Sequence, residues 1–85
     1  MLYLPVLDHA ELGTVAAVRQ LEDGRLGLLA YTALDRLAAA CGSKQPWMLM
    51  STPDLEKLLE IQRFDVVAFD IDIPPALRDG ERLIP

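Results

Sequence analysis

Residues 14–31, TVAAVRQLEDGRLGLLAY, form the stretch that decides the fold. The first half of this stretch alternates between two faces, which is the period-two pattern of a half-buried β-strand. Asp23-Gly24 follows, a dipeptide that accepts the positive φ angles of a type I′ turn. The second half returns as the partner strand, with Arg25 facing Glu22 across the turn. The stretch therefore predicts an antiparallel hairpin.

Upstream of the hairpin, the chain begins with a segment dense in bulky apolar side chains. Residues 2–7, LYLPVL, predict a first strand. Pro5 has no N–H to donate to a sheet ladder, so we expect this strand to lie at a sheet edge or to be bulged at the proline. A polar turn over residues 9–13 connects it to the hairpin.

Downstream of the hairpin, the spacing of apolar residues changes from two to nearly four at Thr32. This change predicts a short helix. One face of the helix is apolar and carries Leu34, Leu37, Ala38 and Cys41. We expect the Thr32 side chain to cap the start of the helix and Gly42 to end it.

Three further segments complete the predicted domain. Residues 45–50, QPWMLM, are an apolar run of strand length that we expect to form an inner strand. The following STPD has the composition of a helix start, which predicts a second helix over about residues 53–62. Residues 64–71, FDVVAFDI, predict the last strand, and the two adjacent prolines that follow prevent its extension.

The predicted element order is β-β-β-α-β-α-β, which indicates a single small α+β domain. We expect a mixed sheet of about five strands, with two helices on one face. The final strand, helix and strand predict a right-handed crossover and a parallel pair between residues 45–50 and 64–71. The domain is expected to span residues 1–73, with residues 74–85 as a loosely held C-terminal tail.

Composition excludes several classes of partner. The chain has 85 residues and a net charge of −5, with eight basic side chains scattered among thirteen acidic ones. No basic stripe results, so we expect no nucleic-acid partner. The apolar runs fall far short of the ~20 residues of a membrane span, so we expect no membrane partner. The single cysteine, Cys41, and an N-terminal segment without the basic start of a signal peptide favour the cytoplasm.

Asp70 ends a buried apolar run and could serve as a switch, a ligand or a structural group. The surrounding DVVAFDIDIP resembles the phosphoacceptor strand of response-regulator receiver domains. The upstream acidic pair and the later lysine of that family are absent, so we predict that Asp70 is not a phosphoacceptor. A cation held by Asp65, Asp70 and Asp72 is an alternative. We favour a solvated carboxylate at a strand end, or one that braces a neighbouring loop.

The sequence contains no recognisable catalytic arrangement. Cys41 lies on the apolar face of the first predicted helix, where a thiol is usually a core side chain of low reactivity. The single histidine, His9, lies in a polar turn. No G-x-S-x-G, P-loop, G-x-G-x-x-G, C-x-x-C or H-E-x-x-H motif occurs. We therefore predict that the protein is not an enzyme, and we predict no cofactor and no metal.

The aromatic side chains suggest two interpretations. Trp47 could cover the core over the first helix, or it could anchor a protein interface together with Tyr31 and Tyr3, because tryptophan and tyrosine are enriched at such interfaces. Both interpretations stay open at this point.

Three segments together resemble one known family: LYLPVL at the start, DGRLGLLAYTALDRL across the hairpin and first helix, and QPWMLM after it. As a set they are similar to the N-terminal domain family of the bacterial SseB serine-sensitivity-enhancing protein, especially its short stand-alone actinobacterial members. The similarity covers about residues 2–72. It implies a small α+β domain of unsettled biochemical role, without catalytic residues.

The leading hypothesis is therefore a non-enzymatic protein-interaction or regulatory module that pairs with a protein partner or forms a homodimer. The alternative is a small-molecule or metal-responsive sensor that uses the carboxylates near Asp70.

Overall fold

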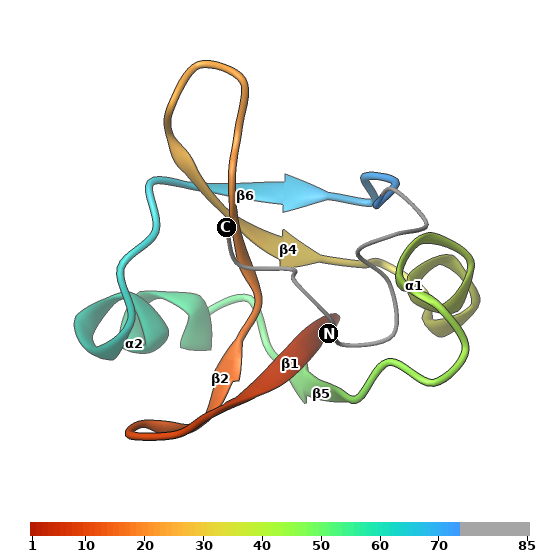
Figure 1. The fold of residues 1–85 in the computed structure, drawn as a ribbon, viewed down its shortest axis with the longest axis horizontal. Helices are drawn as coiled ribbons and strands as arrows, with labels where there is room; N and C mark the ends of the chain where they lie inside the picture. The colour runs from red at the N-terminus through yellow and green to blue at the C-terminus, as the bar shows by residue number, and fades with distance from the viewer. Residues whose placement is uncertain (74–85) are drawn as a thin grey trace.

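The computed structural model describes residues 1–73 of the chain (Figure 1). Within these residues, six strands and two helices follow in the order β1 Leu2–His9, β2 Gly13–Ala16, β3 Val18–Gln20, β4 Leu26–Ala30, α1 Leu34–Cys41, β5 Trp47–Met50, α2 Asp54–Ile61 and β6 Val66–Phe69. The strands form two three-stranded sheets, ordered β2-β1-β5 and β3-β4-β6. The predicted α+β class is confirmed, while the tail over residues 74–85 lies outside the described residues.

The strand predicted over residues 14–22 is divided at Ala17, and each half belongs to a different sheet. The first half, β2, pairs with β1, and the second half, β3, pairs with β4. Ala17 connects the two sheets, because its N–H donates to the Pro5 carbonyl over 2.8 Å while its own carbonyl accepts the Leu29 N–H over 3.0 Å. The predicted single sheet of about five strands is thus two sheets that share one continuous segment.

Pro5 lies where this division occurs, in the central strand of its sheet and not at an edge as expected. The register pairs residue 6 with residue 16, so Pro5 lies opposite Ala17. In an ordinary hydrogen-bonded antiparallel pair, each of the two opposed residues donates one hydrogen bond to the other. Pro5 cannot donate, which leaves the Ala17 carbonyl available to Leu29 of the other sheet. The proline therefore permits the branching of the sheet.

The parallel pair differs from the predicted one. β5 pairs antiparallel with β1, with Leu4 opposite Met48, and lies at the edge of its sheet, so the predicted inner position is wrong. The parallel partners are β4 and β6, with Leu28 opposite Val67. The connection between these two strands runs through α1, β5 and α2, which supplies the long crossover that parallel strands require.

The turn between β3 and β4 is not the predicted type I′ turn. The Gly24 N–H donates to the Leu21 carbonyl, and the Leu21 N–H donates to the Arg25 carbonyl. This pattern closes a three-residue loop in which glycine alone adopts a positive φ, of 87°. Arg25 therefore lies opposite Leu21, and its side chain pairs with Asp23 over 2.5 Å instead of with Glu22.

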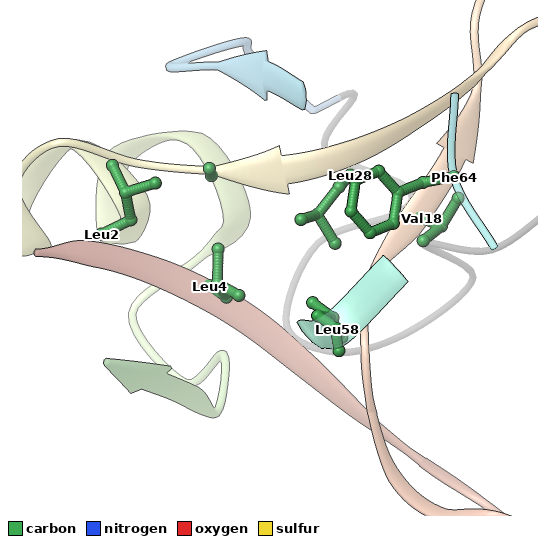
Figure 2. Packing of buried hydrophobic residues seen from close by; sticks show 8 residues of the cluster. Leu2, Leu4, Val18, Leu28, Leu58 and Phe64 are labelled. Atoms are coloured by element: carbon green, nitrogen blue, oxygen red, sulfur yellow. The ribbon is translucent and has the colours of Figure 1, made fainter. Parts of the chain in front are cut away.

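The core consists of two clusters on opposite faces of the strands. The first contains Leu2, Leu4, Ala16, Val18, Leu28, Ala30, Leu58 and Phe64, and Figure 2 shows Leu28, Val18 and Phe64 gathered beside Leu58 of α2. The second contains Ala17, Leu29, Tyr31, Leu37, Ala40, Cys41 and Ile73. Because α2 packs into one cluster and α1 into the other, the prediction that both helices lie on one face is wrong. The predicted burial of Cys41 is confirmed.

Helix and strand ends also differ in detail. α1 begins after Ala33 without a side-chain cap, because the Thr32 hydroxyl donates to another partner, and α2 likewise lacks a side-chain cap. The Ser51 hydroxyl donates to the Asp54 carboxylate over 2.8 Å instead. The polar turn predicted from residue 9 is shorter, since His9 still pairs with Gly13. In the part of the chain described, no helix is long and apolar enough to cross a membrane.

Candidate protein-interaction edge

Asp65 and Asp70 bracket β6 and hold the two ends of the neighbouring strand β4. The Asp65 carboxylate accepts the N–H of Leu26, the first residue of β4, over 2.7 Å. The Asp70 carboxylate accepts the N–H of Thr32, just beyond the end of β4, over 2.9 Å. These two side chains therefore replace ladder hydrogen bonds where the β4–β6 pairing stops.

The Asp70 carboxylate is engaged on both oxygens. Its second oxygen accepts the Thr32 hydroxyl over 2.9 Å and the Arg36 guanidinium over 3.1 Å. The hydrogen bond from the Thr32 backbone, helped by the other two donors, lowers the pKa of Asp70. Asp70 also has a φ of 53°, a left-handed conformation that aspartate tolerates better than most residues. Asp70 thus braces the connection from β4 to α1.

The three carboxylates weighed as a cation site do not converge. Asp65 and Asp70 bind opposite ends of β4, and Asp72 is exposed. Among residues 1–73, no group of three or more histidine, cysteine, aspartate or glutamate side chains is arranged to hold a metal ion. The sensor hypothesis therefore has no specific observation in its favour.

Tyr31, one of the three predicted interface residues, lies inside the domain. Its side chain is fully buried, its hydroxyl donates to the Ile71 carbonyl over 2.7 Å, and the Cys41 thiol donates to that hydroxyl over 3.3 Å. Burial raises the pKa of Tyr31. Its backbone exchanges two 2.9 Å hydrogen bonds with Tyr3 where β1 and β4 meet. Tyr31 thus links β1, β4 and the segment after β6.

The other two predicted residues form an aromatic pair beside β5. The rings of Trp47 and Tyr3 meet edge to face with centroids 5.4 Å apart. Trp47 is 41% exposed, so it lies at the surface and does not complete the core over α1. Leu49, two residues on, is 49% exposed on the same face of the strand. The alternation of QPWMLM could have identified Leu49, had that segment been assigned to an edge.

The backbone of β5 has one paired edge and one open edge. On β1, Tyr3 uses its backbone groups for Tyr31, so the neighbouring Leu4 faces β5 and pairs with Met48. Because backbone groups of successive residues point to opposite edges, the N–H and C=O of Trp47 and Leu49 point away from β1. In the described part of the molecule, no strand lies along this side of β5.

The start of β5 is held to β1 by a glutamine. The Val6 N–H donates to the Pro46 carbonyl, but Pro46 has no N–H to return. The buried Gln45 side-chain amide donates to the Val6 carbonyl over 2.9 Å in its place. The QPW sequence therefore seats β5 on β1 and leaves Trp47 as the first residue whose backbone faces outward.

The opposite edge of the same sheet is covered at Ala16. Ala16, the last residue of β2, directs its backbone groups away from β1. The Gln62 side chain accepts the Ala16 N–H over 3.1 Å and donates to the Ala16 carbonyl over 2.5 Å. One amide side chain thus takes the position that a neighbouring strand would occupy. β5 has no equivalent cover among residues 1–73.

A scan against models of known protein families found no match, and searches of curated proteins and of solved structures found none either.

Proposed function

We propose that the protein is a non-enzymatic protein-interaction module that binds its partner by adding a strand to the outer edge of β5. The observation that carries this proposal is the exposed edge itself, where outward backbone groups lie beside the exposed Trp47 and Leu49. An added strand satisfies such backbone groups, and its alternate side chains meet the side chains beside the edge.

The chemistry of the edge favours an apolar protein segment. Between Lys44 and Asp54 the sequence QPWMLMSTP contains no ionisable side chain. Native proteins commonly protect an edge strand with charges, prolines or a covering element. β5 has a proline before its first residue and no charge along its length, so a neutral, extended segment can approach closely. Trp47, held by its contact with Tyr3, supplies the kind of aromatic anchor that contributes most to protein interfaces.

The sequence resemblance to the SseB N-terminal domain family remains part of this proposal; it implies a small α+β domain and leaves the biochemical role open. We also propose that the protein acts in the cytoplasm, because its single cysteine, Cys41, is buried and the chain uses no disulfide of its own.

Trp47 provides a direct test, because it is the only tryptophan in the chain and its fluorescence reports on this edge alone. The probe is a capped peptide of alternating threonine and valine. We expect the peptide to reduce acrylamide quenching of Trp47 and to slow hydrogen exchange at the amides of Trp47 and Leu49. Leu49→Lys should weaken both effects, while Phe69→Lys, at a 52% exposed position on β6, should not.

Binding that protects β6 amides, or that is equally strong in the Leu49→Lys variant, would contradict the proposal. The same comparison applies to partners captured from a cell extract. A partner retained equally by the wild type and by Leu49→Lys would bind elsewhere on the molecule.

A further inference from the structure

We propose that the segment added to β5 is β5 of a second copy of this chain, in an antiparallel pair related by a two-fold axis at Met48. This inference rests on the proposed function and names its partner. The dimer would contain one continuous sheet ordered β2-β1-β5, followed by β5, β1 and β2 of the partner copy.

The register follows from the residues that face outward. Only Trp47 and Leu49 of β5 direct their backbone groups to the open edge. In an antiparallel pair centred on Met48, Trp47 of each copy lies opposite Leu49 of the other, and each pair can exchange both of its hydrogen bonds. In this register the backbone N–H and C=O groups of Trp47 and Leu49 in one copy bond to those of Leu49 and Trp47 in the other. No residue outside β5 is needed.

The side chains complement one another in the same register. Trp47 and Leu49 lie on the same face of β5 and are about half exposed. In the dimer, each tryptophan lies beside a leucine of the other copy, and the Trp47–Tyr3 pair extends the apolar contact to β1. The exposed apolar surface of one copy is therefore covered by the same surface of the other.

Charge favours the antiparallel orientation. The uncharged stretch that contains β5 begins after Lys44 and ends before Asp54. An antiparallel pair brings the Lys44 end of each strand toward the Asp54 end of the other, so opposite charges approach at both ends. A parallel pair would bring like charges together. The net charge of −5 on each copy acts mostly from residues farther away, where salt screens it.

Two-fold symmetry explains why assembly through β5 would stop at two copies. The outer edge of β2 is occupied at Ala16 by the Gln62 amide. A two-fold contact that uses the same edge from both copies is closed and leaves no free β5 edge for a third.

Sedimentation equilibrium of the full chain, from low micromolar to millimolar concentration, measures the association directly. We expect a reversible change from one chain to two. Leu49→Lys places two ammonium groups against the tryptophans of the contact and should weaken dimerisation on the order of 100-fold. Phe69→Lys, with a similar exposure on β6, should leave the dimerisation constant unchanged.

Leu49→Pro tests the backbone contribution separately. The Leu49 N–H faces away from β1, so proline removes a donor of the proposed dimer without removing a bond of the β1–β5 ladder. We expect a monomer with an intact far-ultraviolet circular dichroism spectrum. If this variant does not fold, Leu49→Lys and the concentration dependence of Trp47 hydrogen exchange decide the question.

The outcomes separate this inference from the proposed function. A mass of one chain at every concentration, together with binding of the threonine-valine peptide at Trp47, overturns the second-copy proposal and leaves strand addition standing. A chain that stays monomeric and does not bind the peptide overturns both the second-copy proposal and the proposed function. A dimer that persists in Leu49→Lys, or that is lost in Phe69→Lys, assigns the contact to another surface and overturns the inference.

Discussion

The two outer edges of the β2-β1-β5 sheet differ in what covers them. On the β2 side, Ala16 exchanges hydrogen bonds with the side chain of Gln62, which lies 46 residues away in the sequence. On the β5 side, the outward groups of Trp47 and Leu49 have no such cover within the described residues, and both side chains are substantially exposed. The same small sheet thus has one edge that is covered at Ala16 and one edge that is open at both outward residues of β5.

Edge protection in this domain is therefore local, because a particular side chain covers a particular stretch of backbone. The Gln62 side chain covers one edge at Ala16, whereas no comparable side chain covers the outward groups of Trp47 and Leu49 within the described residues. Among the strands of residues 1–73, β5 alone combines an edge position, an uncharged sequence and an exposed tryptophan. A fold that merely tolerated open edges would not be expected to concentrate these three features in one strand.

Removing the cover of the closed edge should have the largest effect on stability. Gln62→Ala leaves the N–H and C=O of the buried Ala16 without their partners, and we expect a loss of about 2 kcal/mol in the free energy of unfolding. Urea denaturation measures it. Gln20→Ala, at an exposed glutamine of β3, is the matched control and should change little. Equal effects of the two substitutions would show that Gln62 does not close the edge.

A substitution of Pro5, at the junction between the two sheets, should have a smaller effect on the free energy of unfolding. Pro5→Ala introduces an N–H whose natural acceptor, the Ala17 carbonyl, is already used by Leu29. It also removes buried apolar atoms and increases the conformational entropy of the unfolded chain. We expect a destabilisation of about 1 kcal/mol.

The matched control for Pro5 is Pro53→Ala, because Pro53 is exposed and lies directly before α2, outside the strands. The midpoint of urea unfolding should fall for the first variant and hardly move for the second. A midpoint that rises in Pro5→Ala would mean that β1 and β2 gain an ordinary ladder bond, and that the proline is not needed for the branching.

Much of the fold could be predicted from local patterns. The alternation of residues 14–31, the helical spacing after Thr32 and the composition of STPD identified the hairpin and both helices within a few residues. The exact turn was missed because Asp-Gly fits two loop lengths, and only the Leu21–Arg25 hydrogen bond distinguishes them.

The sheet order could not be derived from the same patterns. Pro5 is typical of an edge strand, yet it lies at the point where one strand changes partners, which depends on Ala17 and Leu29 far along the chain. Trp47 lies at the surface beside Tyr3, whereas Tyr31 is buried. The sequence could not separate them, because an aromatic side chain at the end of a strand suits both a core and a surface.

Lowering the pH should reduce the free energy of unfolding, in part through protonation of Asp70. Its folded-state pKa is lowered below the ordinary 3.8, so its contribution to stability is fully present above that value. The contribution is lost as pH falls through 3.8 toward the lower folded-state pKa. Asp70→Asn keeps a residue that tolerates a positive φ but removes the charge, so it should flatten this part of the stability profile.

Urea unfolding at several pH values between neutrality and about pH 3 tests the assignment, with Asp72→Asn as the control. Asp72 is exposed and lies two residues after the brace. If both variants retain the wild-type acid dependence, the carboxylate of Asp70 does not brace the connection from β4 to α1.

The smallest expected effect concerns the open edge. Leu49→Thr keeps a residue suited to a strand at a position that is 49% exposed, so the stability of a single chain should change by no more than about 0.5 kcal/mol. Leu29→Thr, at a fully buried position on β4, should by contrast cost several-fold more. The open edge is therefore expected to contribute little to folding, although Trp47 and Leu49 are both exposed large hydrophobic side chains.

Protein concentration sharpens this last prediction. Association stabilises the folded state by mass action, so the melting temperature of the wild type should rise with concentration while that of Leu49→Thr should rise less. At low concentration the two should coincide, because each chain then unfolds alone. A difference that is large at low concentration would show that Leu49 packs within its own chain, and the contrast between a closed β2 edge and an open β5 edge would then disappear.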